Sequence, residues 1–279
     1  MTISQLREYI YETLSQAGIK EYQSECRLIL EHIGISNTRA MIYADAQVGD
    51  KQEVAVAIAK ERATTRRPIQ HLLGEAWFYG RPFFVDERCL IPRFDTEVLC
   101  REAIELILKM HEPKVADICT GSGCIAITVS LETGVKVDAT DISCEALDVA
   151  RQNAKTHGAN VDFWQGDLLE PLAKDAQYDI ILSNPPYIDP VERGELEPEV
   201  TEYEPATALF AEDEGLVFYK RLANEVDPYL KDGGYLAVEI GNTQGEQVSS
   251  IFERAGFTGV SVIRDYGDND RVVIGQKNR

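Results

Sequence analysis

The chain has 279 residues, of which 44% are hydrophobic and 27% charged, and its formal net charge is −19. This length and apolar content suit one large or two ordinary domains with a real hydrophobic core. No apolar run reaches the roughly 18 residues of a membrane span, the first residues lack a secretory signal, and the acidic excess disfavours a nucleic-acid ligand, so we expect a cytoplasmic protein without a membrane partner.

Residues 1–74 have the pattern of a small helical bundle. Apolar residues recur at helical spacing from the third residue onward. Two segments have the spacing of a capping box, namely Thr2 with Gln5 and Asp50 with Glu53. Glycines stand where helices are expected to end: Gly18, Gly34 and Gly74.

Residues 75–95 change to an aromatic-rich pattern. The segments Trp77-Phe78-Tyr79 and Pro82-Phe83-Phe84-Val85 flank Gly80-Arg81, which predicts a β-hairpin. We expect this hairpin to link the helical domain to a second domain over residues 96–279.

From residue 96 onward, strand-like and helical segments alternate, as in a doubly wound α/β sheet. Only five residues, 266–270, join the last two strands, so that connection must be a hairpin and not a parallel crossover. The resulting fold class is α/β, a Rossmann-like seven-stranded sheet with an antiparallel last strand, which resembles class I methyltransferases. The expected strands are 114–119, 135–140, 160–165, 178–183, 235–240, 259–265 and 271–277.

The first of these strands runs into a glycine-rich turn, Cys119-Thr120-Gly121-Ser122-Gly123, and a helix follows. Glycines at a helix N-terminus let the backbone approach a ligand closely. Asp141 ends the second strand, where a carboxylate can accept hydrogen bonds from both ribose hydroxyls. An adenosine-bearing cofactor is indicated, although Gly121-x-Gly123-x-x-Ala126 with Asp141 also fits a dinucleotide fingerprint.

Two acidic residues favour S-adenosyl-L-methionine over a dinucleotide. Asp117 lies just before the glycine turn, where it would face the cationic amino group of that cofactor and repel a pyrophosphate. Asp167 and Leu168 follow the third strand, where an acid can bond an adenine and an apolar side chain can cover it. A helix cap is the alternative role for Asp167.

The fourth strand ends in Asn184-Pro185-Pro186-Tyr187. Each proline fixes its own φ and restricts the residue before it, so the turn is stiff. The Asn184 side-chain oxygen and the Pro185 carbonyl can each accept one hydrogen of a planar NH2 group, and Tyr187 can stack on that group. We therefore interpret this turn as a site that holds an amide or nucleobase nitrogen for methylation; a purely structural turn is the alternative.

The acidic residues are concentrated directly after this turn. Residues 189–214 contain ten acids and one base, Arg193. Such segments usually serve solubility, but this one begins two residues after Tyr187 and could also attract a basic protein partner. Association with such a partner would then slow as salt rises.

The six cysteines form no CxxC pair and have no histidine at metal spacing. We predict free, buried thiols and no metal site.

Several motifs together resemble the release factor glutamine methyltransferases of the PrmC/HemK family, over nearly the whole chain. The Asn-Pro-Pro-Tyr turn is shared with nucleic-acid amino-methyltransferases, whereas the other motifs are more specific to the family. These other motifs are Pro68-Ile69-Gln70-His71-Leu72-Leu73-Gly74, Ile91-Pro92-Arg93-Phe94-Asp95-Thr96-Glu97, Tyr187-Ile188, Tyr203-Glu204-Pro205 with Ala208-Leu209, and Arg264-Asp265-Tyr266-Gly267-Asp268-Asn269-Asp270-Arg271-Val272.

The resemblance implies methyl transfer from S-adenosyl-L-methionine to the side-chain amide nitrogen of the glutamine in the Gly-Gly-Gln motif of class I peptide chain release factors, which would modulate translation termination. It also implies that the helical domain recognises this protein substrate. The expected cofactor-binding residues are Asp117, Cys119, Thr120, Gly121, Ser122, Gly123, Asp141, Asp167, Leu168 and Asn184. The expected substrate-binding residues are Asn184, Pro185, Pro186 and Tyr187, with Asn184, Pro185 and Tyr187 as the catalytic ones.

Three further candidates lie in the family motifs: Arg93, Thr96 and Glu204. Interdomain packing and helix capping are the alternative roles for the first two. The chain departs from the family pattern at Phe94, where proline is usual, and at Cys119, where glycine is usual.

Three other functions remain as alternatives at this point. A methyltransferase for the exocyclic amine of a nucleic-acid base would share the Asn184 chemistry but needs a basic groove. A non-catalytic cofactor sensor would not need Asn184, and a nicotinamide-dependent oxidoreductase leaves the Asn-Pro-Pro-Tyr turn unexplained.

Overall fold

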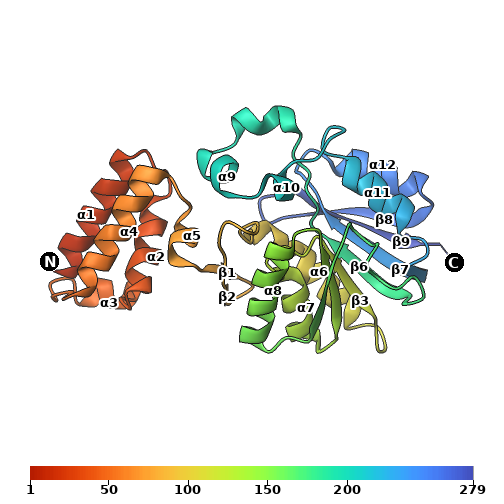
Figure 1. Cartoon of the computed structure of the whole chain (residues 1–279), viewed down its shortest axis with the longest axis horizontal. Helices are drawn as coiled ribbons and strands as arrows, with labels where there is room; N and C mark the ends of the chain where they lie inside the picture. Colours follow the sequence, from red (N-terminus) through yellow and green to blue (C-terminus); the bar gives the residue numbers. More distant parts are fainter. Residues whose placement is uncertain (279) are drawn as a thin grey trace. The chain divides into compact units, whose positions relative to one another are not determined.

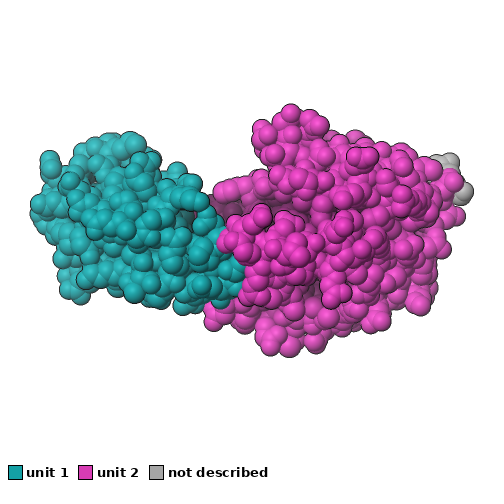
Figure 2. Space-filling view, turned by 90° about the horizontal axis from the view of Figure 1, so that it is seen from above, with its two compact units in different colours: residues 1–74, 197–203 teal, residues 75–196, 204–279 magenta. Residues whose placement is uncertain are grey.

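The computed structural model describes residues 1–278, which group into two compact units (Figures 1 and 2). Unit 1 consists of Met1–Gly74 together with Glu197–Tyr203, and unit 2 contains the remainder of the described chain. The chain therefore leaves unit 2 at residue 196, contributes a short segment to unit 1, and returns at residue 204. No sequence pattern predicted this second contribution to unit 1.

Unit 1 is a helical bundle around a core of aliphatic side chains, as the sequence predicts. The capping box of Thr2 and Gln5 is present in both directions. The one expected at Asp50 is wrong: Asp50 has helical φ and ψ and its side chain makes no capping bond, because an N-cap requires extended backbone. The helices are α1 (Ile3–Gln16), α2 (Tyr22–His32), α3 (Asn37–Ile42), α4 (Lys51–Thr65), α5 (Ile69–Leu73) and, in the returning segment, α9 (Pro198–Tyr203).

Ion pairs hold the returning segment within unit 1. The Arg62 guanidinium lies 2.8 Å from Glu25 and 3.0 Å from Glu199, and Arg66 lies 2.7 Å from Glu199. The Arg62 side chain is almost fully buried, so its charge would be expensive to bury without these two acidic partners. The Lys20 ammonium pairs with the nearby Glu197 at 2.5 Å.

Unit 2 begins with the predicted hairpin, formed by β1 (Ala76–Phe78) and β2 (Arg81–Phe83) as an antiparallel pair. The buried rings of Phe78 and Phe83 meet edge to face, with centroids 6.0 Å apart. Both rings belong to the hydrophobic cluster that includes α6 (Glu97–Ile107) and α7 (Cys124–Thr133). The hairpin is therefore packed onto unit 2.

The main sheet of unit 2 has the order β5-β4-β3-β6-β7-β9-β8. Strand β9 is antiparallel to both of its neighbours, while the pairs from β5 to β7 are parallel. The predicted fold class, including the seven strands and the antiparallel last strand, is confirmed. The strands are β3 (Val115–Ile118), β4 (Val137–Asp141), β5 (Val161–Gln165), β6 (Tyr178–Ser183), β7 (Leu230–Glu239), β8 (Phe257–Arg264) and β9 (Asp270–Lys277).

Helices cover both faces of this sheet (Figure 1). None of the helices in residues 1–278 has the length and apolar content that crossing a bilayer requires. The helical elements of unit 2 are η1 (Phe94–Thr96), α6 (Glu97–Ile107), α7 (Cys124–Thr133), α8 (Cys144–His157), η2 (Pro190–Glu195), α10 (Ala206–Leu209), α11 (Val217–Glu225) and α12 (Gly245–Arg254).

Successive residues of the central strands enter two separate cores. On β6, Ile180 and Leu182 pack into the cluster with α6 and α7, while Ile181 packs into the cluster with α11 and α12. Side chains alternate across a strand, so a strand with helices on both sides needs apolar residues on both of its faces. This explains why the central strands appear as continuous apolar runs.

The cysteines that the structure describes are all free thiols. Cys26, Cys89, Cys100 and Cys124 are buried, and Cys119 is half-buried. The prediction of buried thiols is wrong for Cys144, which is exposed at the start of α8.

Candidate functional site

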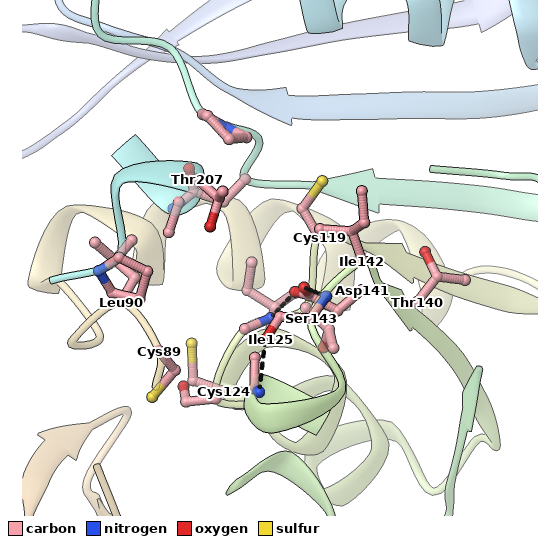
Figure 3. Close-up of a pocket in the computed structure, with 18 of the residues that line it drawn as sticks. Cys89, Leu90, Cys119, Cys124, Ile125, Thr140, Asp141, Ile142, Ser143 and Thr207 are labelled. Atoms are coloured by element: carbon pink, nitrogen blue, oxygen red, sulfur yellow. Dashed lines mark hydrogen bonds between the residues drawn. The ribbon is translucent and has the colours of Figure 1, made fainter. Parts of the chain in front are cut away.

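The strand order creates a crevice at the carboxyl ends of β3 and β6. From β3 the chain winds outward through β4 to β5, and it then returns to the other side of β3 as β6. Ligands of doubly wound sheets bind at such a reversal, because the loops there run in opposite directions and leave a gap. A cavity of about 280 Å³ lies at this position. In Figure 3, Cys119 and Asp141 lie on one side of it, and Leu90 and Thr207 lie on the other.

Most of the residues predicted for the site lie around this one cavity. Those that line it are Arg93, Thr96, Cys119, Thr120, Gly121, Ser122, Asp141, Asp167, Leu168, Asn184 and Pro186. Those that lie outside its lining are Asp117, Gly123, Pro185, Tyr187 and Glu204. The structure thus brings the expected cofactor residues and Asn184 together, while their individual roles stay predictions.

The turn between β3 and α7 is built from left-handed backbone. Cys119, Gly121 and Gly123 all have positive φ, of 60°, 55° and 81°. A Cβ added to Gly123 would lie 2.9 Å from Ile127 Cδ1 and 3.1 Å from Ala150 Cβ, so only glycine fits where α7 begins. The turn therefore presents backbone, with little side chain, to the cavity.

Cys119 is the strained member of this turn. Its Cβ costs about 1–2 kcal/mol in the left-handed region, while glycine would lose about 0.4–1 kcal/mol through its greater freedom in the unfolded chain. We expect Cys119→Gly to raise the free energy of unfolding by about 1 kcal/mol, measured by urea denaturation. Cys119→Ala is the control, because it removes the sulfur and keeps the Cβ. If the alanine variant gained as much stability, the thiol and not the backbone would be the cause.

Asp117 is fully buried beneath the turn. Its Oδ2 accepts hydrogen bonds from Thr120 Oγ1 at 2.6 Å and from the Ala126 amide at 3.1 Å, whereas its Oδ1 has no partner among the described residues. Burial raises the pKa of Asp117 to about 7, against the lowering effect of these two hydrogen bonds. An unpartnered carboxylate oxygen at this place fits a cationic ligand group, although direct contact with one remains a prediction.

Asp141 joins the end of β4 to the glycine turn. Its Oδ2 accepts the Gly121 amide at 2.8 Å, and its Oδ1 accepts the Ser143 amide at 2.9 Å. Burial raises the pKa of Asp141, and these backbone hydrogen bonds oppose that shift. A carboxylate has about four lone-pair sites, so Asp141 retains acceptor capacity for a ligand.

Asp167 also lines the cavity, but its carboxylate already has a partner. Both of its oxygens accept hydrogen bonds from the Arg221 guanidinium, each at 3.0 Å. The Asp167 side chain therefore does not cap a helix, which was the alternative role. The next residue, Leu168, has φ of 48° and is buried against the cavity.

A side-chain hydrogen bond from Gln244 holds the backbone of the Asn-Pro-Pro-Tyr turn. Gln244 Nε2 donates to the Tyr187 carbonyl at 3.1 Å, and its Oε1 accepts from the Gly241 amide at 2.9 Å. Burial raises the pKa of the Tyr187 hydroxyl, so the ring remains neutral at physiological pH. The predicted stacking of Tyr187 on a substrate amide stays a prediction, because its side chain lies outside the cavity lining.

Gly215 packs directly against this turn, with φ of 78°. A Cβ at Gly215 would lie 2.1 Å from the Tyr187 carbonyl oxygen, which is backbone and cannot move aside cheaply. We expect Gly215→Ala to lower the free energy of unfolding by about 2–3 kcal/mol, measured by urea denaturation. Gly194→Ala is the control, because its Cβ would meet no atom within 4 Å. Equal stability of the two variants would contradict this close approach.

Arg93 and Glu204 form an ion pair of 2.5 Å at the edge of the cavity. Arg93 lines the cavity and Glu204 does not. Burial raises the pKa of Glu204, and the Arg93 charge opposes this shift. Glu204 thus holds Arg93 in place, which is a different role from contact with a ligand.

Thr96 does not cap α6, since its side chain makes no capping hydrogen bond. Its hydroxyl instead accepts a hydrogen bond from Asn184 Nδ2 at 3.3 Å. Of the two alternative roles considered for this residue, helix capping is therefore wrong.

Glu239 is a site residue that no motif singled out. It ends β7, is 1% exposed, and lies near Thr96, Arg271 and Arg93. An acid at the carboxyl end of a strand is the signal that identified Asp141, so the sequence did contain the evidence for Glu239. Within residues 1–278, no three metal-binding side chains come together as a possible metal site.

Two parts of the chain match known protein families. Residues 5–74 match the family described as PrmC N-terminal domain, and residues 96–200 match the methyltransferase small domain. A release factor glutamine methyltransferase of Geobacter sulfurreducens is 35% identical over 277 residues, which cover 99% of this chain and 96% of that protein. One from Fusobacterium nucleatum is 45% identical over 218 residues, which cover 77% of this chain but only 62%, less than two thirds, of that relative.

Among solved structures, a methyltransferase from Pyrococcus furiosus superposes with a TM-score of 0.56, covering 72% of this chain and 91% of that chain. The two sequences are 19% identical, so this likeness supports the fold alone.

Proposed function

The chain belongs to the family of release factor glutamine methyltransferases, and on this premise we propose that it methylates the glutamine of the Gly-Gly-Gln motif in class I peptide chain release factors. The methyl donor in this proposal is S-adenosyl-L-methionine, whose positively charged sulfur carries an electrophilic methyl group. The observation that supports the proposal most directly is Asn184 at the end of β6, on the same cavity as the glycine turn after β3.

In the proposed reaction the glutamine amide nitrogen attacks the methyl carbon. The new N–C bond forms as the S–C bond breaks, and the nitrogen then releases one proton to give a neutral methylamide and S-adenosylhomocysteine. Asn184 Oδ1 and the Pro185 carbonyl accept the two amide hydrogens, which orients the nitrogen for in-line attack. No dedicated base is required before transfer, because the proton becomes acidic only after the nitrogen is alkylated.

The proposed cofactor site uses the chain's own donors and acceptors. Asp141 would accept hydrogen bonds from the ribose hydroxyls, Leu168 would cover the adenine, and Asp117 Oδ1 would provide negative charge for the amino group. The unpartnered Asp117 oxygen fits this assignment better than it fits a pyrophosphate, which it would repel.

A basic protein partner fits the surface charge better than a nucleic acid does. Four acids of residues 189–214 already pair with bases of this chain: Glu197, Glu199, Glu204 and Asp213. Among the described residues, the other six acids of this segment form no ion pair: Asp189, Glu192, Glu195, Glu202, Glu212 and Glu214. The attraction of this segment for a basic partner is therefore weaker than the sequence alone implies. The remaining negative charge would still repel a phosphate backbone. Because release factors act on the ribosome, the reaction belongs in the cytoplasm.

The test is to incubate the protein with methyl-labelled cofactor and a class I release factor. We expect label on the release factor and none on a variant whose motif reads Gly-Gly-Ala. Label that persists on this variant, or that goes to DNA or RNA instead, would overturn the proposal in favour of another target.

A further inference from the structure

Only the nitrogen end of the Asn184 side-chain amide forms a hydrogen bond with another described residue. Its Nδ2 donates to Thr96 Oγ1 at 3.3 Å, and its Oδ1 makes no hydrogen bond with another described residue. A carboxamide has a donor end and an acceptor end, so this contact determines which end is left for a ligand. Thr96 is 2% exposed and its hydroxyl is not used to cap α6, so it is available to Asn184.

Glu239 is a second neighbour of the Thr96 hydroxyl. It is the last residue of β7, which pairs with β6, and its carboxylate accepts a hydrogen bond from Thr96. A hydroxyl that accepts a bond from Asn184 still has its own hydrogen to give, and Glu239 receives it. The second carboxylate oxygen, Oε2, has no partner among the described residues. The three side chains therefore form one directed chain of hydrogen bonds from Asn184 to Glu239.

We propose that Thr96 and Glu239 are positioning residues that hold the Asn184 amide with its oxygen toward the cavity. This inference rests on the proposed function, because a substrate NH2 group needs an acceptor at that place. A flipped Asn184 would present its own NH2 group and repel the substrate. Hydrogen bonds in a low-dielectric interior polarise one another, so ionised Glu239 also makes Asn184 Oδ1 a stronger acceptor.

The orientation depends on the charge of Glu239. Burial raises the pKa of Glu239 to about 7, against the lowering effects of the Thr96 hydrogen bond and of Arg271. Above this pH the carboxylate can only accept from Thr96, whereas below it the protonated carboxyl can donate to Oγ1 and compete with Asn184. The charged and titratable groups that face Glu239 are Arg271 from β9, Arg93 and Asp95 before α6, Cys100 from α6, Cys124 from α7, Tyr187 after β6 and Tyr219 from α11.

The first test compares kcat for release factor methylation in three threonine variants at saturating cofactor. We expect Thr96→Val to lower kcat about tenfold, the scale of one lost hydrogen bond, with the release factor KM unchanged within twofold. Thr96→Ser keeps the hydroxyl and should retain most of the activity. Thr128→Val is the matched control, because Thr128 is fully buried in α7 and its hydroxyl has no partner among the described residues. Wild-type kcat in Thr96→Val, or an equal loss in Thr128→Val, would overturn the proposal.

The second test is the pH dependence of kcat in Glu239→Gln. In the wild type we expect kcat to rise with pH through about 7, and in the variant we expect this rise to be absent. At pH 8 the variant should be about fivefold slower than the wild type, and at pH 6 the two should agree within twofold. A variant that keeps the wild-type rise near pH 7 would overturn the role of Glu239.

Thermal unfolding separates positioning from simple structural support. The folded-state pKa of Glu239 lies above the usual 4.5, so its ionisation destabilises the folded chain as the pH rises from about 4.5 to 7. At pH 8 Glu239→Gln should therefore have a Tm no lower than the wild type. A lower Tm together with lower kcat would mean that Glu239 only supports the fold.

The wild type distinguishes failure of this inference from failure of the proposed function. If the wild type does not methylate a release factor, the proposed function itself fails, and the positioning role of Thr96 and Glu239 fails with it. If it does, and the Thr96 and Glu239 variants match it at every pH, only the positioning role is overturned.

Discussion

Replacing Asn184 with alanine is expected to lower turnover by roughly 10²–10³ while cofactor affinity stays within about tenfold, the scale of losing one transition-state hydrogen-bonding group. In the proposed mechanism Oδ1 of Asn184 orients the substrate nitrogen, whereas the cofactor would be held mainly by the cavity-lining loops after β3, β4 and β5. Single-turnover kinetics with labelled cofactor measures the turnover, and calorimetric titration measures the cofactor affinity.

The control for this variant is Asn224→Ala, at an exposed helical asparagine whose side-chain amide donates to the Lys220 carbonyl. It should leave both quantities unchanged. If Asn184→Ala lost binding and turnover by the same factor, the asparagine would serve general cofactor binding and not the orientation of the substrate.

Replacing Asp141 with alanine is expected to weaken cofactor binding about a thousandfold. Two hydrogen bonds from ribose hydroxyls to a carboxylate contribute about 2 kcal/mol each, and 1.4 kcal/mol corresponds to a factor of ten. The variant also removes the acceptor of the Gly121 and Ser143 amides, so the turn itself loses support. Calorimetric titration with the cofactor measures the effect.

Asp141→Asn is the matched comparison, since it keeps the size and one acceptor oxygen but removes the charge. We expect a smaller loss, about tenfold to a hundredfold. If cofactor affinity were unchanged in both variants, Asp141 would only support the turn, and the ribose would have to be held elsewhere.

The features that the sequence predicted well are those set by local pattern. Strands such as β6 are visible because both of their faces are buried, and the antiparallel end of the sheet follows from the short connection before β9. The closeness of Asn184 and Asp141 to one cavity was predictable because they stand at the carboxyl ends of β6 and β4, the two parallel neighbours of β3.

The features that it missed depend on contacts between distant residues. Asn184 and Thr96 are 88 positions apart, and Arg62 and Glu199 are 137 apart, so no periodicity or spacing connects them. The capping box at Asp50 failed for a related reason. Residue spacing alone does not fix the backbone angles that an N-cap requires, and tertiary structure imposed helical ones there.

The return of residues 197–203 to unit 1 has a consequence for anyone who works with fragments of this protein. A fragment that begins at residue 75 would keep this segment but lose Lys20, Arg62 and Arg66, the bases that hold Glu197 and Glu199. Its acids would then repel one another in a free loop. Two stretches that line the cavity flank this loop in the chain. Asn184 and Pro186 belong to the stretch before the loop, and Pro205 and Thr207 belong to the stretch after it. The excised region would thus carry a free loop between two stretches of the cavity lining, because its boundary cannot be drawn with a single cut.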